Sequence, residues 1–120
     1  MLIKSSSLNI EHNRDNGVLT SSVSGRIDGM TATEFEENVR GEVAETDTGV
    51  IIDLSGVTYL SSAGLRSMLL IAKMLNKLGS AFVLCSVPNT ILEIIKIAGF
   101  DRIINVVETH ADAIAKVGKK

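Results

Sequence analysis

A change of hydrophobic period in the middle of the chain constrains the fold more than any other feature. Val50, Ile51 and Ile52 form a short continuous apolar run, which is typical of a strand buried on both faces. After a polar segment, apolar residues recur at helical spacing, at Leu65, Met68, Leu69, Ala72 and Leu75. This pattern predicts a buried strand that leaves its sheet through a polar turn, within residues 53–66, and enters a helix.

Two strands joined as a hairpin are expected ahead of this unit, over residues 8–14 and 17–25. They are joined at Asp15-Asn16-Gly17, and Asn-Gly favours a tight hairpin turn because both residues tolerate positive φ. A helix is expected next, since Thr31 and Glu34 have the spacing of a capping box.

The second half of the chain continues the alternation. Leu78-Gly79 is a helix stop, because glycine accepts the left-handed cap. Apolar runs at residues 81–85 and 103–107 predict strands. Helices are expected to begin near Pro88 and after Thr109, which is a good N-cap residue.

The resulting order, β-β-α-β-α-β-α-β-α, predicts the α/β fold class and a single domain over residues 1–120. We expect a mixed β-sheet, with an antiparallel N-terminal hairpin plus parallel strands, and about four helices packed mainly on one face. The early strands contain too many serines to be buried on both sides. Functional residues are expected at the carboxyl ends of the parallel strands.

Composition excludes several classes of function. The formal net charge is −2, with no basic stripe to neutralise phosphates, so no nucleic-acid partner is expected. No apolar run approaches the roughly 18–20 residues that cross a bilayer, so we expect no membrane insertion. Cys85 is the only cysteine and no signal peptide is evident. We therefore predict that the protein is cytoplasmic.

The chain offers no catalytic or metal-binding constellation. His12, His110 and Cys85 are isolated and share no ligand spacing, so neither a metal nor another cofactor is expected. Ser62 has no histidine near it in sequence to act as a base. Nucleotide-binding glycine motifs are absent. The protein is therefore predicted not to be an enzyme.

Two polar features remain, the Ser61-Ser62 pair and the carboxylates of Asp28 and Asp53. From the residues alone, either serine could simply cap the following helix, Asp28 could be a turn residue and Asp53 could end a strand. A hydroxyl at a helix N-terminus is also a favourable place to hold a phosphate, because unpaired N–H groups and the helix dipole point at it.

Two segments together resemble the signature of the STAS domain family, specifically its stand-alone bacterial anti-sigma factor antagonists. They read Asp-Leu-Ser-Gly-Val at residues 53–57 and Tyr-Leu-Ser-Ser-Ala-Gly-Leu-Arg at residues 59–66. The resemblance spans nearly the whole chain, including Gly-Arg-Ile-Asp at 25–28, Ser-Val-Pro at 86–88 and Ala-Gly-Phe at 98–100.

This resemblance implies a partner-switching regulator. The unphosphorylated form would bind an anti-sigma factor or related serine kinase of the histidine-kinase-like ATPase fold and relieve its inhibition. Phosphorylation of a serine at the helix start would block binding, and a metal-dependent serine phosphatase would reverse it. The output need not be a sigma factor, and we expect a monomer when the protein is free.

The resemblance also assigns residues. The phosphoacceptor falls on Ser62, with Ser61 as the alternative because it stands where the family often has aspartate. Arg66 stands where the family often has glycine. The residues implied in partner binding are Arg26, Asp28, Asp53, Ser61, Ala63, Gly64 and Arg66.

Two other functions are compatible with this order of elements. One is a STAS scaffold or ligand-binding module that phosphorylation does not control. The other is a receiver-like signalling domain, which is disfavoured because no adjacent acidic pair ends the first strand and the hairpin breaks the order of elements that a receiver requires.

Overall fold

Within the part of the chain that the structure describes, five strands form one sheet in which their spatial order follows the sequence, β1-β2-β3-β4-β5. The computed structural model describes residues 8–118. The strands are β1 (Leu8–Asp15), β2 (Val18–Ile27), β3 (Gly49–Leu60), β4 (Ala81–Cys85) and β5 (Asn105–Val106). β1 and β2 are antiparallel, and each later neighbour is parallel. The predicted mixed sheet with its N-terminal hairpin is confirmed.

The hairpin turn has the predicted chemistry. Asn16 has φ 52° and Gly17 has φ 77°, so both adopt the left-handed conformation of a two-residue turn. Asp15 pairs with Val18 directly across it. The turn therefore sets the register of the whole hairpin.

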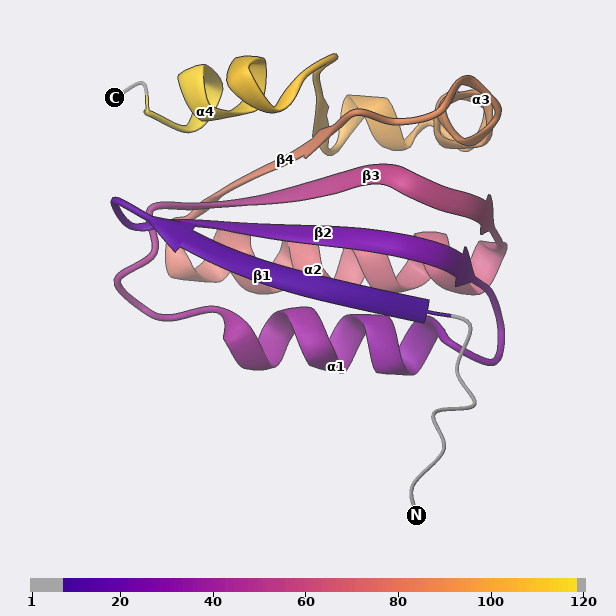
Figure 1. Ribbon diagram of the computed structural model, residues 1–120, viewed down its shortest axis with the longest axis horizontal. Coiled ribbons are helices and arrows are strands. Elements are labelled where there is room, and N and C mark those ends of the chain that lie inside the picture. The colour runs from indigo at the N-terminus through magenta and orange to yellow at the C-terminus, as the bar shows by residue number, and fades with distance from the viewer. Residues whose placement is uncertain (1–7, 119–120) are drawn as a thin grey trace.

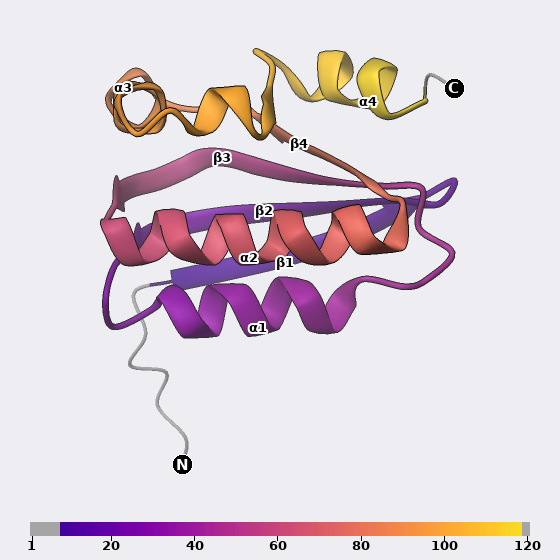
Figure 2. The same ribbon diagram turned by 180° about the vertical axis from the view of Figure 1, so that it is seen from behind.

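Four helices of the described segment cover the sheet. They are α1 (Ala32–Glu42), α2 (Ser62–Leu78), α3 (Asn89–Ile97) and α4 (His110–Gly118), with a short 3₁₀ turn at Phe100–Arg102. Figure 2 shows α1 and α2 side by side in front of the strands. α3 joins them in the main core through Ile91 and Ile95. Three helices thus share one face, as expected.

The last helix packs on the opposite face. Ala113 and Val117 of α4 cover Ile51, Val83 and Cys85, which form a second, smaller core. On β3, Val50, Ile52 and Leu54 point instead into the main core. Because successive side chains of a strand alternate between faces, this sandwiching explains why the run is continuously apolar.

β3 extends further than the sequence predicts. The segment expected to leave the sheet as a polar turn continues as strand to Leu60. Between the pairs Ser22↔Asp53 and Ile27↔Leu60, β3 spends two more residues than β2, through two register shifts. Such bulges leave the extra residues unpaired and redirect their side chains, while the strand resumes its pairing beyond them. The expectation that Asp53 ends the strand is therefore wrong.

The bulge explains Gly56. A Cβ at this position would lie 2.6 Å from the Ser24 Cβ and 3.3 Å from the Val23 carbonyl oxygen. The two backbones approach each other too closely for a side chain, a common reason for glycine inside a strand.

The final strand is shorter than predicted. Its expected span was 103–107, but only Asn105–Val106 pair with β4. Gly99, at φ 79°, starts the 3₁₀ turn, and the amides of Ile103 and Ile104 donate to the Phe100 carbonyl. These bonds hold the first part of the segment in a turn.

Helix ends follow local chemistry at most positions. Gly79 has φ 75° and donates to the Asn76 carbonyl, while Ser80 donates to the Leu75 carbonyl, which confirms the predicted glycine stop. The Thr109 hydroxyl accepts from the Asp112 amide over 3.0 Å and confirms the predicted cap of α4. Within residues 8–118, no helix is long and apolar enough to cross a membrane.

Candidate switch site at the ends of β2 and β3

The start of α2 lies beside the turn that follows β2. The arrowheads of β2 and β3 meet at the same end of the sheet in Figure 1. Ile27 pairs with Leu60, and the Ser61 amide donates to the Ile27 carbonyl over 2.9 Å. Residues after each strand are thereby brought together, as expected of parallel neighbours.

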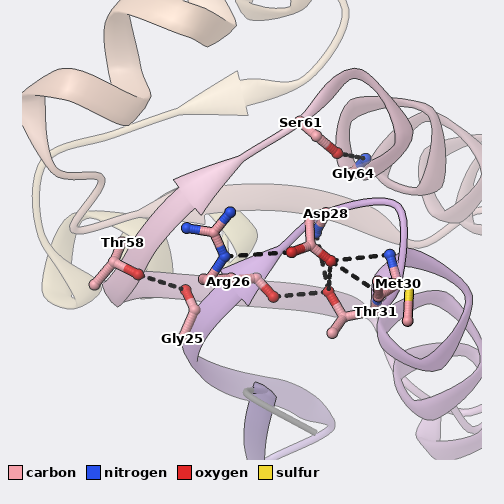
Figure 3. Close-up of polar contacts among 8 residues, drawn as sticks. All are labelled: Gly25, Arg26, Asp28, Met30, Thr31, Thr58, Ser61 and Gly64. Carbon is pink, nitrogen blue, oxygen red and sulfur yellow. Dashed lines mark hydrogen bonds and ion pairs between the residues drawn. The ribbon is translucent and has the colours of Figure 1, made fainter.

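Ser61 caps α2. Its backbone is extended, with φ −96° and ψ 174°, and its hydroxyl accepts from the Gly64 amide over 3.3 Å (Figure 3). This satisfies one of the N–H groups that a helix leaves unpaired at its start. The hydroxyl of Ser61 is therefore already engaged in structure.

Ser62 is the first residue of α2 and is exposed. Within residues 8–118, its hydroxyl has no hydrogen-bond partner. The first turn of α2 contains no acidic residue. A negative charge on Ser62 would therefore meet the positive end of the helix dipole without an acid in the same turn.

Gly64 brings α2 close to the end of β2. A Cβ there would lie 2.6 Å from Leu60 Cδ1, 2.8 Å from Ile27 Cγ2 and 3.0 Å from the Ile27 carbonyl oxygen. Gly64 is buried, so it shapes the site by close approach, whereas Ala63 is partly exposed beside it.

Asp28 organises the turn between β2 and α1. One of its carboxylate oxygens accepts from the Met30 amide over 2.9 Å and from the Thr31 amide over 3.2 Å (Figure 3). The Met30 amide is the main cause of a lowered pKa at Asp28, which burial opposes and which Arg26 and Thr31 reinforce. Asp28 is thus a turn residue whose carboxylate is held ionised.

The predicted capping box at Thr31 is wrong. Thr31 has a helical backbone and its side chain makes no cap to α1. The hydroxyl instead donates to the Arg26 carbonyl over 2.7 Å and accepts from the Asp28 amide over 2.9 Å. Asp28 already takes the amides at the start of α1, so the Thr31 hydroxyl ties the turn back to β2.

Arg26 links this turn to β3. Its guanidinium lies 4.3 Å from the centre of the Tyr59 ring, and its Nε donates to Asp28 over 3.3 Å. The Tyr59 side chain is substantially exposed. Such a cation–π contact positions both side chains at the surface.

Arg66 lies one helical turn after Ser62 and is exposed. Among the described residues it forms no ion pair. The structure therefore brings six of the seven predicted partner-binding residues to one end of the sheet, namely Arg26, Asp28, Ser61, Ala63, Gly64 and Arg66.

Asp53 is the exception. It pairs with Ser22 and Cys85 inside the sheet, and its carboxylate accepts from the Ser55 amide over 2.9 Å. Ser22 precedes Ile27 by five residues, which is about 16 Å of strand. Asp53 shapes the bulge and does not lie beside the serine pair.

Sequence reasoning missed two neighbours of the site. Met30 is 91% exposed at the tip of the turn, and Tyr59 lies under Arg26. The signal for Met30 was its position directly after Asp28-Gly29, a pair typical of an exposed turn. The contact of Arg26 with Tyr59 follows only from the strand register.

The two histidines form hydrogen bonds with polar side chains, and the cysteine is buried. His12 lies 2.8 Å from the Ser21 hydroxyl and 2.6 Å from the Asn38 amide oxygen. His110 contacts the Thr20 hydroxyl at 2.9 Å, and Cys85 is fully buried. Within residues 8–118, no three His, Cys, Asp or Glu side chains are grouped to hold a metal ion.

The serine pair lines neither of two hollows found among residues 8–118. Hollows of about 570 and 500 Å³ are found elsewhere, one beside α3 and β5 and the other beside α2 and β4. Neither is lined by Ser61, Ser62, Asp28 or Arg26. An exposed serine outside these hollows suits recognition by another macromolecule better than enclosure of a small ligand.

Comparison with known proteins gives a consistent match. The chain matches the STAS domain over residues 9–113. It is 32% identical to BtrV of Bordetella bronchiseptica, named as an anti-sigma factor antagonist, over 82% of this chain and 85% of that protein. It is 33% identical to the anti-sigma-F factor antagonist RsfB of Mycobacterium tuberculosis, over 85% of this chain and 83% of that protein.

A solved structure shows the same fold. The crystal structure of an anti-sigma factor antagonist from Mycobacterium paratuberculosis superimposes with a TM-score of 0.86 and 29% identity, covering 98% of this chain and all of that one. These names describe regulators that oppose another regulator, and none is the name of an enzyme.

Proposed function

Because this chain belongs to the STAS domain family, as a homologue of anti-sigma factor antagonists, we propose that it is a partner-switching regulator controlled by phosphorylation of Ser62. The unphosphorylated form binds an anti-sigma factor that is also a serine kinase of the histidine-kinase-like ATPase fold. Binding relieves the inhibition that this partner exerts. Phosphorylation of Ser62 blocks binding, and a metal-dependent serine phosphatase restores it.

The difference between the two serines carries the proposal. The Ser61 hydroxyl accepts a hydrogen bond from Gly64, so modifying it would break the cap of α2. Ser62 is exposed and its hydroxyl has no partner within residues 8–118. A kinase can therefore modify Ser62 without disturbing the fold, which favours Ser62 over Ser61 as the acceptor.

The switch acts through surface charge. A phosphate adds about −1.5 to −2 charges and three acceptor oxygens. The start of α2 stabilises it by about 0.3–1 kcal/mol, partly offset by the nearby Asp28 carboxylate. These terms are small within the domain. At an interface, a desolvated and unpaired phosphate costs several kcal/mol, so the effect falls on binding.

The proposed binding surface surrounds the acceptor. It comprises Arg26, Asp28, Ser61, Ala63 and Arg66, with Gly64 beneath them as the residue that permits close packing. Exposed Tyr59 and Met30 add apolar area of the kind found at interface centres. We propose that the protein acts in the cytoplasm and is a monomer when free.

The test is phosphopeptide mapping of the protein purified from its own host, followed by assays with the kinase that copurifies with it. We expect phosphate on Ser62. Ser62→Ala should bind the kinase whether or not ATP is present, whereas ATP should release the wild-type protein. Ser61→Ala is the matched control, and its release by ATP should persist. Release of Ser62→Ala by ATP would exclude Ser62 as the switch.

A further inference from the structure

Arg66 lies on the same side of α2 as Ser62. Residues four apart on an α-helix are neighbours, with about 5–6 Å between their Cβ atoms. Both side chains are exposed. Since Arg66 forms no ion pair within residues 8–118, its guanidinium is available to a charge that appears on Ser62.

The exposed face of α2 contains no competing anion. The helix carries three cations, Arg66, Lys73 and Lys77, and no aspartate or glutamate. At 3.6 residues per turn, these three and Ser62 fall within about 60° of the helix circumference. Ser62 therefore stands at the N-terminal end of a basic stripe, and Arg66 is the first cation along it.

We propose that Arg66 receives the phosphate of phospho-Ser62 within the same molecule. The inference rests on the proposed function, which supplies the phosphate. An anion that precedes a cation by four residues has the favourable orientation on a helix. The planar guanidinium can donate two N–H groups to two phosphate oxygens, a geometry that a lysine cannot reproduce.

This pairing changes what a partner meets. Before modification, the surface around Ser62 presents a hydroxyl and a free cation. Afterwards it presents a phosphate whose oxygens are partly occupied by Arg66. A partner that binds the Arg66 charge thus loses that contact when the phosphate is added to the same surface. One covalent event therefore withdraws an attraction and adds a repulsion.

Other charged or titratable groups also lie on the elements next to α2. They are Arg26 and Asp28 from β2 and its turn, Asp53 and Tyr59 from β3, Cys85 from β4, and Glu34, Glu36, Glu37, Arg40 and Glu42 from α1. Arg26 forms an ion pair with Asp28, and Arg40 forms one with Glu36. All of these groups are unchanged when Arg66 alone is substituted, so a comparison of variants isolates its effect.

The test installs phosphoserine at position 62 by genetic encoding, without any kinase, and follows the second ionisation of the phosphate by phosphorus NMR. The pKa of this step is ordinarily about 6. Arg66 favours the dianion and lowers the pKa. We expect Arg66→Gln to raise it by about 0.3 pH units relative to the wild type. Arg66→Lys should retain part of the effect on the pKa, because lysine keeps the positive charge but lacks the planar pair of N–H donors.

Lys73→Gln is the matched control. Lys73 lies on the same face but eleven residues further along, about 16 Å down the helix. That distance exceeds the Debye length of about 8 Å at physiological salt, so the phosphate pKa should equal that of the wild type. If the Arg66→Gln variant does not fold, Arg66→Met provides the same comparison, because it removes the charge and retains an unbranched aliphatic side chain.

The outcomes separate this inference from the proposed function. Identical titration of the wild type and Arg66→Gln overturns the inference, and so does an equal shift in Arg66→Gln and Lys73→Gln. Because the phosphate is installed directly, neither result depends on a kinase. Absence of phosphate on Ser62 in the host would overturn the proposed function and leave the measured pairing intact.

Discussion

Arg14 and Asp47 form a two-pronged ion pair, in which Nε and a terminal nitrogen of Arg14 each donate to a different carboxylate oxygen over 2.8 Å. The Asp47 side chain is fully buried, whereas 36% of the Arg14 side chain is exposed. Asp47 also accepts from the Ala44 amide, and Arg14 donates to the Glu42 carbonyl. The pair ties β1 to the segment that joins α1 and β3.

Asp47→Asn is expected to destabilise the fold by about 2 kcal/mol, because the amide cannot accept both N–H groups and Arg14 loses its partner. The hydrogen bond from Arg14 is the main reason that the pKa of Asp47 is lowered, against the effect of burial and with help from the Ala44 amide. A lowered carboxylate pKa adds stability above its unfolded value of about 3.9, and this stability is lost as pH falls through the folded value.

Urea unfolding between pH 7 and pH 2 measures this dependence. The wild type should lose more stability on acidification than Asp47→Asn does. Glu42→Gln is the control, since Glu42 lies 4.0 Å from Arg14 at the surface and should contribute less than about 0.5 kcal/mol. Equal acid sensitivity of the wild type and Asp47→Asn would contradict the assignment.

Gly64→Ala tests the close approach of α2 to β2. The added Cβ would lie 2.6 Å from Leu60 Cδ1 and 3.0 Å from the Ile27 carbonyl oxygen. We expect a loss of about 1–3 kcal/mol in the free energy of unfolding, since backbone must shift. Gly41→Ala in α1 meets nothing within 4 Å and should stabilise by about 0.5–1 kcal/mol. The same substitution thus has opposite signs in two helices.

Most features that depend on nearby residues were predictable from the sequence, the capping box at Thr31 being an exception. The Asn16-Gly17 turn, the Gly79 stop and the Thr109 cap each follow from local backbone preferences. The extent of β3 did not follow, because Ser55 and Gly56 have turn chemistry. Their strand conformation is imposed by the bulged pairing with β2. Pairing between distant segments outweighed local propensity there.

The same distinction applies to the site. That one of the two serines caps α2 could be anticipated from the strand-to-helix switch, whereas its identity as Ser61 follows from the structure. The separation of Asp53 from the serine pair by about 16 Å could not, because it follows from the continued pairing of β3 with β2 as far as Leu60. The Arg26–Tyr59 contact joins residues 33 positions apart in sequence, so no local pattern reveals it.

Gly49→Ala and Val117→Ala form a double-mutant test of the packing of α4 against β3. A Cβ on Gly49 would overlap Val117 Cγ1. Gly49→Ala alone should cost about 1–3 kcal/mol by overpacking, and Val117→Ala alone should cost about 1–2 kcal/mol by truncation. Removing the valine makes room for the new methyl, so the double variant should be more stable than the sum of the two losses predicts. Strict additivity in chemical denaturation would argue against this contact.

Cys85 provides a probe of global unfolding. Its side chain is fully buried between β3, β4 and α4, and burial raises the pKa of its thiol. Because the thiolate is the reactive form, a thiol reagent at pH 8 should label the native protein orders of magnitude more slowly than the urea-unfolded chain. Labelling of both at one rate would mean that the second core opens without global unfolding.

Ser61 and Ser62 are predicted to differ in stability as well as in chemistry. Ser61→Ala removes the hydroxyl that accepts from the Gly64 amide and should cost about 1 kcal/mol, within the range of about 0.5–2 kcal/mol for lost caps. Ser62→Ala removes an exposed hydroxyl from the first helical position and should change stability by less than about 0.5 kcal/mol. Thermal and urea unfolding of the two variants measure the difference, and Ser61→Asn, which restores a cap, should recover most of the loss. A larger cost at Ser62 than at Ser61 would reverse the two roles, because the residue that holds the helix start is the one least free to accept a phosphate.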